Sequence, residues 1–181
     1  METRQRASVA SGFGPLPINL KQWIDEVRLV HLSLVAVQAL DPVETPGSRC
    51  PSDQEFPAPM MMTLLTYCFS IGLFGSHDIE RSIASDSAVR YLCANQFPDA
   101  NQIRSFRRRN TPQLKESLFN LFKIVWTRQF NDPSPSPYSL RASDPARHVP
   151  ASPTQWEREL SIEADLRIKM AMLIDSMALD E

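Results

Sequence analysis

Residues 60–75 read MMMTLLTYCFSIGLFG, the strongest apolar run of the chain and the stretch that decides its fold. The run is 16 residues long and includes polar or small residues, among them Thr63, Thr66, Tyr67, Ser70 and Gly72. A helix that crosses a membrane needs about 20 apolar residues, so this run is too short and too polar for that role. It instead predicts a helix at the centre of a globular core, in a cytoplasmic protein without a membrane partner.

The composition favours an all-helical protein. The chain has 181 residues, of which 43% are hydrophobic, and this suffices for one compact domain with appendages. It contains only five glycines and few alternating β-branched runs, whereas tight hairpins usually need glycine or Asn-Gly turns. We therefore predict an all-α fold, with a compact multi-helix domain that contains a helix-turn-helix-like unit.

Two clusters of prolines divide the chain. Each proline removes an amide donor and disfavours helix in the residue before it, and the clusters cover residues 41–58 and 131–153. We therefore predict a flexible amino terminus (1–14), a helical domain (15–130) that contains the first Pro-rich connector, a Pro/Ser-rich linker, and a C-terminal amphipathic helix (154–181).

Start signals divide the helical domain further. Residues 18–40 carry apolar side chains at spacings of three and four, which predicts one amphipathic helix. Residues 59–130 are predicted to form five short helices, with start signals at Ser76, at Ser85 or Asp86, at the Asp99–Gln102 capping box, and at Thr111 followed by Pro112. Short helices joined by tight turns are typical of a helix-turn-helix. The expected core comprises Ile79, Ile83, Val89, Leu92, Ile103 and Phe106, covered by a longer helix with Leu114, Leu118, Leu121, Phe122 and Val125.

The basic charge of the chain is concentrated in one segment. Residues 99–110 read DANQIRSFRRRN, and residues 99–130 hold seven basic and two acidic side chains. The whole chain is slightly acidic by contrast, with 19 Lys and Arg against 21 Asp and Glu. A basic block between acidic regions favours the binding of a polyanion, and a phosphate backbone is the commonest one.

The predicted DNA contacts lie in this segment and just after it. They are Asn101, Gln102, Arg104, Ser105, Arg107, Arg108, Arg109 and Lys115. Arg104 and Arg108 are one helical turn apart, so we expect them to point outward together and to be replaceable by alanine without loss of fold. Arg107 has a structural alternative, an ion pair with Glu80. Four or five neutralised phosphates predict that log affinity falls with log salt at a slope of about −4.

A family resemblance adds to this interpretation. The chain resembles the amino-terminal domain of InsH-type insertion-sequence transposases in Pro59 followed by MMMTLLTYCFSIGLFGS, and then in Glu80, Asp86, Ala88, Arg90, Pro98-Asp99, Ile103 and Phe106-Arg107. The resemblance covers residues 15–130 and is densest over 59–108. It implies a helical domain that binds double-stranded DNA, such as the ends of a mobile element, in a bacterial cytoplasm and close to the nucleoid.

The chain departs from that family after residue 130. Family members continue into an RNase H-like catalytic domain, whereas this chain continues into Pro/Ser-rich sequence around Asp132 and Asp144. A two-metal site needs carboxylates held on a rigid scaffold, and the remaining residues are too few for a five-stranded domain. The resemblance therefore implies a stand-alone or truncated relative that lacks the strand-transfer residues. We expect the protein not to be an enzyme.

No metal or cofactor chemistry is predicted either. Cys50, Cys68 and Cys93 have no metal-ligand spacing, and we interpret them as small buried residues of a reducing compartment. His77 and Asp78 are adjacent, but neighbouring helical positions point about 100° apart, so they form no catalytic dyad. We expect no metal and no cofactor.

Two interpretations of the C-terminal helix stay open. Its apolar stripe has a break near Leu166 and comprises Trp156, Leu160, Ala164, Met170, Leu173, Ile174 and Met177. The helix either returns to the domain and completes its core, or it binds a partner. The function classes divide similarly: a helix-turn-helix DNA-binding protein, or an interaction module that forms a homodimer or inhibits a full-length transposase.

Overall fold

The computed structural model describes residues 15–40, 56–131 and 153–178. Every regular element within these ranges is helical, so the predicted all-α fold is confirmed. The elements are a 3₁₀ turn, η1 (Leu20–Gln22), and the helices α1 (Glu26–Gln38), α2 (Ala58–Ser70), α3 (Ser76–Ser85), α4 (Ser87–Leu92), α5 (Ala100–Arg109), α6 (Thr111–Asn131) and α7 (Pro153–Met177). The predicted flexible amino terminus and most of both predicted connectors lie outside the described residues.

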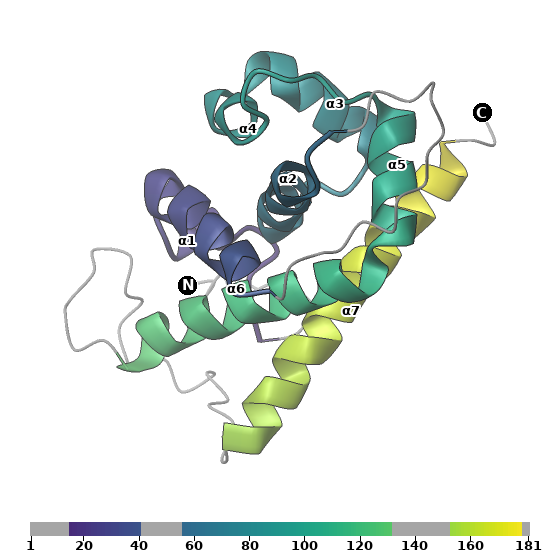
Figure 1. Ribbon diagram of the computed structural model, residues 1–181. Helices are drawn as coiled ribbons and strands as arrows, with labels where there is room; N and C mark the ends of the chain where they lie inside the picture. Colours follow the sequence, from purple (N-terminus) through teal and green to yellow (C-terminus); the bar gives the residue numbers. More distant parts are fainter. Residues whose placement is uncertain (1–14, 41–55, 132–152, 179–181) are drawn as a thin grey trace, which may run out of the picture.

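Helix α2 runs through the centre of the molecule (Figure 1). It contacts α1, α4, α5 and α6, and every residue from Met61 to Ser70 is buried. The prediction of a central buried helix is therefore confirmed. Among the described helices, none combines the length and the hydropathy that a membrane crossing requires.

The hydroxyl groups of α2 find partners inside the core. Thr66 Oγ1 donates to the carbonyl oxygen of Met62 (2.8 Å) and lies 2.7 Å from Oγ of Ser117 on α6. Thr63 Oγ1 donates to the carbonyl oxygen of Pro59 (2.8 Å). A buried hydroxyl without a partner costs free energy, so these bonds explain how a helix with polar side chains can occupy the centre of the core.

Gly72 ends α2. Its φ is +84°, in the left-handed region, and the N–H of Leu73 donates to the carbonyl oxygen of Cys68 (2.9 Å), which closes the last turn. A Cβ atom at this position would lie 2.7 Å from Cγ2 of Ile18. The backbone angle and the close approach of Ile18 therefore both require glycine.

The chain between residues 58 and 131 forms the five predicted helices, α2 to α6. Asp86 caps α4 by accepting hydrogen bonds from the N–H groups of Ala88 and Val89. Asp99 and Gln102 form the predicted capping box of α5. Local capping chemistry therefore placed these helix starts correctly.

Two predicted boundaries were wrong. Residues 18–40 form η1 and α1 rather than one helix, because Asp25 is extended and caps α1 by accepting from the N–H of Arg28 (2.9 Å). Ser76 is the first residue of α3, and Gly75 occupies the cap position. The hydroxyl of Ser76 is instead used by a distant carboxylate, described below.

The predicted core is buried as expected. Ten of its eleven members are fully or almost fully buried, namely Ile79, Ile83, Val89, Leu92, Ile103, Leu114, Leu118, Leu121, Phe122 and Val125. Phe106 is half-buried and packs against this core from α5. The apolar spacing was therefore a sound guide to the interior of α3 to α6.

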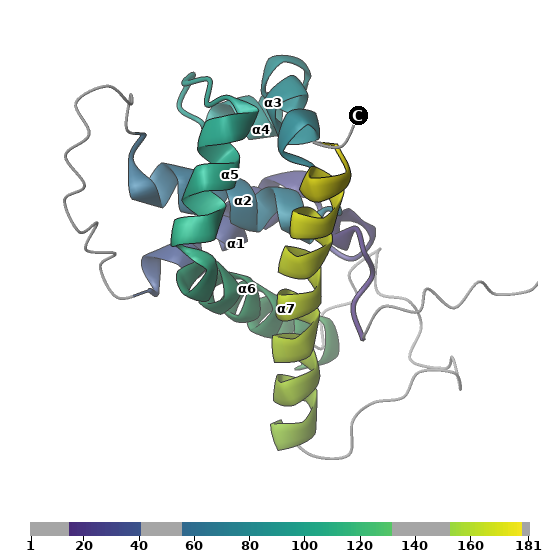
Figure 2. The same ribbon diagram turned by 90° about the vertical axis from the view of Figure 1, so that its right-hand side faces the viewer.

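Helix α7 lies along one side of the molecule and packs mainly against α6 (Figure 2). Its buried stripe comprises Leu160, Glu163, Ala164, Arg167, Ile168, Ala171 and Asp175. The apolar pattern of the sequence breaks near Leu166 because charged residues occupy part of the buried stripe. Leu173 and Met177, which the sequence pattern placed in the stripe, are exposed. Trp156 stacks on Trp126 of α6 with ring centroids 6.4 Å apart. The helix therefore completes the core.

Candidate nucleic-acid interface

Helix α5 has one buried side and one exposed side. The buried residues are Ala100, Ile103, Arg104 and Arg107. The exposed residues are Asn101, Ser105, Arg108 and Arg109. Successive helical residues are rotated by about 100°, so the four exposed residues form one continuous arc. We call this arc the α5 face; the helix that carries it lies at the edge of the molecule (Figure 1).

Arg108 and Arg109 are the cations of the α5 face. Both are exposed, and among the residues that the structure describes neither guanidinium group has a carboxylate or a hydrogen-bond partner. They lie in the last turn of α5, where the negative end of the helix dipole stabilises positive charge. The α5 face therefore presents two cations without partners in the described part of the chain, together with an amide and a hydroxyl group.

Arg107 lies in the interior. Its Nη2 is 2.7 Å from Oδ2 of Asp175 on α7, and both side chains are almost wholly buried. The same carboxylate accepts hydrogen bonds from the backbone N–H (2.8 Å) and the Oγ (2.5 Å) of Ser76 at the start of α3. Asp175 therefore provides the start of α3 with the acceptor that its own cap position lacks, and it joins α3, α5 and α7.

This contact changes the predicted role of Arg107. The residue does have the structural role considered as an alternative, but its partner is Asp175 and not Glu80. Glu80 instead accepts a hydrogen bond from the backbone N–H of Ala100 (3.3 Å). As packed here, Arg107 cannot reach a ligand at the surface.

The same cluster sets the charge state of Asp175. Burial by itself would raise the pKa of this carboxyl group. The hydrogen bonds from Ser76 and the adjacent Arg107 guanidinium outweigh burial, so the pKa of Asp175 is held below its ordinary value. The carboxylate is therefore charged at neutral pH and can compensate the buried cation.

Arg104 is also buried, at 6% exposure, and its Nη2 donates to Oδ1 of Asn101 (2.6 Å). The prediction that Arg104 and Arg108 point outward together was therefore wrong for Arg104. Residues four apart share a side of a helix, but the spacing does not say where the covered arc ends. Arg104 lies on the covered side of α5, a helix that contacts α2, α3 and α6, whereas Arg108 is exposed.

Gln102 and Lys115 already have partners within the protein. The side chain of Gln102 accepts from the backbone N–H of Asp99 (2.9 Å) in the capping box. Lys115 Nζ lies 3.6 Å from Oδ1 of Asp165 on α7, at a partly exposed position. The eight predicted contacts thus divide into four exposed residues, two buried arginines and two residues with other contacts.

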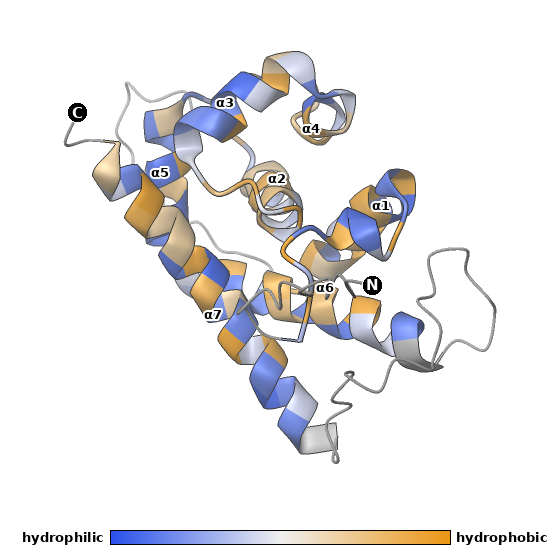
Figure 3. Ribbon diagram, turned by 180° about the vertical axis from the view of Figure 1, so that it is seen from behind, coloured by the Kyte–Doolittle hydropathy of each residue, from blue (hydrophilic) through white to orange (hydrophobic). Residues whose placement is uncertain are grey.

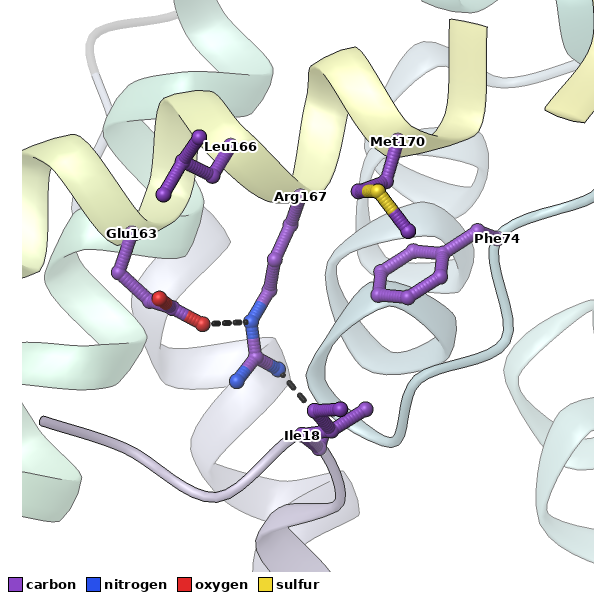
Figure 4. Close-up of a pocket in the computed structure, with 6 residues that line it drawn as sticks. All are labelled: Ile18, Phe74, Glu163, Leu166, Arg167 and Met170. Carbon is purple, nitrogen blue, oxygen red and sulfur yellow. Dashed lines mark hydrogen bonds and ion pairs between the residues drawn. The ribbon is translucent and has the colours of Figure 1, made fainter. Parts of the chain in front are cut away.

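A second buried arginine, Arg167 of α7, was not predicted (Figure 4). Its Nε donates to Oε1 of Glu163 (2.8 Å). Its Nη1 lies 2.9–3.1 Å from the carbonyl oxygens of Ile18, Phe69 and Ser70. Phe69 and Ser70 end α2, so Arg167 satisfies carbonyl groups that the helix terminus leaves without partners.

A small cavity lies beside this arginine (Figure 4). It is lined by Ile18, Phe74, Glu163, Leu166, Arg167 and Met170. Its volume is about 30 Å³, which has room for one or two water molecules. A cavity of this size is far too small for a nucleotide or a comparable cofactor.

Sequence reasoning missed the Arg167–Glu163 pair and the true partner of Arg107, although each cluster left a signal. Glu163 and Arg167 are four residues apart and interrupt the apolar stripe of α7, a position that solvent-exposed charges rarely take. Arg107 follows Ile103 by four residues and therefore lies on the apolar side of its helix. Charges at apolar stripe positions indicated buried ion pairs, but their partners could not be read from the sequence.

The cysteine thiols in the described ranges are not poised for nucleophilic chemistry. Cys68 and Cys93 are buried, as predicted, and neither forms a disulfide. Burial raises the pKa of Cys68, and it raises the pKa of Cys93 to about 11. Both thiols are therefore protonated at neutral pH. Cys50 lies outside the described residues.

His77 and Asp78 contact different partners. His77 Nδ1 lies 3.6 Å from Oε2 of Glu80, and Asp78 forms an ion pair with Arg81. Each pair spans one helical turn of α3, as expected for exposed side chains near a helix start. Within the described ranges, no three side chains of the metal-ligating types are grouped closely enough to hold an ion.

Comparisons with known proteins return no match. No protein-family model, no curated protein and no solved structure is significantly similar to this chain.

Proposed function

We propose that this protein is a relative of InsH-type transposases that binds double-stranded DNA through the α5 face. The observation that carries the proposal is the pair Arg108 and Arg109, exposed side by side without carboxylate partners in the described ranges. Helices α3, α4 and α5 serve as the helix-turn-helix-like unit, and α5 takes the role of the helix that enters the major groove.

The side chains of the α5 face suit two kinds of DNA contact. Arg108 and Arg109 can neutralise phosphates or bind the acceptor edge of guanine. Asn101 keeps its amide donor available, because the contact with Arg104 uses only its Oδ1. With two of the predicted arginines buried, we expect two or three neutralised phosphates, which corresponds to a slope of log affinity against log salt of about −2 to −3.

A mobility-shift titration at several salt concentrations tests the proposal. Wild-type protein should bind a DNA duplex at low salt and lose affinity with the stated slope. The double variant Arg108→Ala/Arg109→Ala should lose about two units of that slope, because each phosphate contact contributes about 0.9. Wild-type protein that does not bind at low salt, or binds without salt dependence, would exclude this function.

A matched control separates the α5 face from net charge. Arg28 and Arg158 are exposed on α1 and α7. The double variant Arg28→Ala/Arg158→Ala therefore removes the same charge from other surfaces. We expect it to bind DNA with the wild-type slope, and an equal loss in the two double variants would show that the α5 face is not the site.

The second candidate function is an interaction module, either a homodimer or a partner of a full-length transposase. It is favoured by large apolar side chains of α7 that remain exposed, namely Ile162, Leu173 and Met177. Aligned apolar residues on one side of a helix are typical of surfaces that a partner covers. The mass in solution, measured together with the mobility shift, distinguishes the two candidates.

A further inference from the structure

We propose that the exposed side of α7 pairs with the same side of α7 in a second copy of this chain. In this arrangement the two helices are antiparallel, and a two-fold axis passes close to Arg167 and Ile168. The inference develops the second candidate function, specifying its partner and its geometry. It does not depend on DNA binding.

The first observation is the alignment of two exposed apolar residues. Ile162 is 59% exposed and Leu173 is 55% exposed. They are eleven residues apart, which is close to three full turns, so they lie almost on one line along the helix. Single exposed apolar residues are common, but two in line on one helix provide a seam for another helix.

The second observation is the charge pattern between them. Asp165 and Lys169 lie one turn apart, with Nζ of Lys169 2.6 Å from Oδ2 of Asp165, and both are partly or largely exposed. They lie almost symmetrically about the same midpoint as Ile162 and Leu173. Along the exposed side of α7 an apolar residue is therefore followed by an acidic one, a basic one and a second apolar one, namely Ile162, Asp165, Lys169 and Leu173.

That order makes the face self-complementary in one direction only. In an antiparallel pair, Ile162 faces the partner's Leu173 and Lys169 faces the partner's Asp165, and the two-fold axis repeats each contact. In a parallel pair, Lys169 would face the partner's Lys169 and like charges would meet. The antiparallel arrangement is therefore the one that the charges permit.

The position of α7 leaves this side accessible. The helix runs along the edge of the molecule in Figure 3 and lies on the side that faces the viewer in Figure 2. Helix α6 packs against another part of its surface, and Nζ of Lys115 on α6 lies 3.6 Å from Oδ1 of Asp165. In Figure 3 apolar and charged residues alternate along it. A single pair of helices buries less than the roughly 800 Å² per partner of a standard interface, so association should be weak and depend on concentration.

Sedimentation equilibrium of the whole chain at rising concentration tests the pairing. The mass should rise from 20.5 kDa toward twice that value. Leu173→Glu should stay monomeric, because it places a charge in the apolar seam. The matched control is Val27→Glu on α1, at a residue that is 81% exposed, and it should associate like the wild type. Thermal melts by circular dichroism establish that both variants are folded.

Charge reversal tests the direction of the helices. Asp165→Lys and Lys169→Glu should each abolish association, because each places like charges opposite one another. An equimolar mixture of the two single variants should associate, and so should the double variant Asp165→Lys/Lys169→Glu. The double variant is the arm that distinguishes the two directions. In a parallel pair it would place Lys opposite Lys and Glu opposite Glu, whereas the mixture of single variants is complementary in either direction.

Three results would overturn the proposal. The first is a wild-type chain that stays monomeric up to about 1 mM, a concentration at which even weak complexes form. The second is a Leu173→Glu variant that associates like the wild type. The third is a mixture of the two single charge variants that stays monomeric. A mobility shift measured with Leu173→Glu gives a separate readout for DNA binding. The failure of one proposal can therefore be told from the failure of the other.

Discussion

Arg107 and Arg108 are neighbours in the sequence and have opposite environments. Arg107 is 1% exposed and paired with Asp175, while Arg108 is exposed and has no ion-pair partner in the described ranges. The two positions differ by about 100° around α5, enough to move a side chain from the interior to the surface. The same substitution should therefore destabilise the protein at Arg107 and have little effect on its stability at Arg108.

The first prediction compares alanine at these two positions. Arg107→Ala should lower the free energy of unfolding by about 3–5 kcal/mol, because Asp175 remains buried without its cation. Arg108→Ala should change it by less than about 0.5 kcal/mol, as is usual for exposed residues. Urea denaturation measures both, and since each variant loses one positive charge, equal effects would contradict the buried ion pair.

The second prediction concerns the pH dependence of stability. The pKa of Asp175 is lower in the folded protein than in the unfolded chain, where it is about 3.9. Its contribution to stability is therefore fully present above the unfolded pKa and is lost as the pH falls through the folded pKa. Asp175→Asn should be less stable than the wild type at pH 6. Between pH 5 and pH 2 its stability should fall by less than the stability of the wild type does.

Thermal melts of the wild type and of Asp175→Asn between pH 2 and pH 6 measure how stability depends on pH. Asp165 provides a matched control, because the pKa of this exposed carboxyl group is also lowered, chiefly by its hydrogen bond from Lys169. Asp165→Asn should follow the wild-type pH profile closely, since exposed ion pairs contribute little. Parallel profiles for Asp175→Asn and the wild type would show that this carboxylate is not stabilised in the fold.

At the scale of the element, α5 depends on local chemistry at its start and on distant contacts along its length. The capping box satisfies backbone donors at the first turn through residues only three apart. The ion pair with Asp175 fixes the other end to α7. The cap decides where α5 begins, whereas the distant contact decides which side of it is covered.

The third prediction tests the cap. Asp99→Ala should lower the free energy of unfolding by about 1 kcal/mol, within a range of 0.5–2, because the first turn loses an acceptor. Ser105→Ala, at an exposed position inside the same helix, should be neutral or slightly stabilising, because alanine has the higher helix propensity. Urea denaturation of the two variants separates the cap from the general effect of alanine, and similar losses would argue against the capping box.

At the scale of the whole molecule, α7 joins parts of the chain that are far apart in sequence. Through Arg167 it contacts the end of α2 and the chain before η1, and through Asp175 it contacts the start of α3 and α5. The guanidinium of Arg167 also lies 4.8 Å from the ring centroid of Phe122 on α6. The helix is therefore a structural part of the domain, and its exposed side is available for other contacts.

The fourth prediction follows from these contacts. A chain that ends at residue 152 loses the buried stripe of α7 and leaves Arg107 without its carboxylate. It should lose cooperative unfolding and bind a hydrophobic dye, because the apolar surface of α6 is then open to water. The full chain with Leu173→Glu is the control and should unfold cooperatively. A truncated chain that melts like the full chain would mean that α7 is an appendage.

From the amino-acid sequence alone it was possible to predict the helical class, the five helices between residues 58 and 131, most of their starts and nearly all of their core. These features depend on capping residues, prolines and apolar spacing, which act over a few residues. The folded arrangement was needed to show that Arg104 and Arg107 are buried, and that Arg108 and Arg109 are exposed without ion-pair partners among the described residues. The physical reason is that the burial of a charge depends on its compensating partner, and Asp175 reaches Arg107 only when α7 folds back onto α3 and α5.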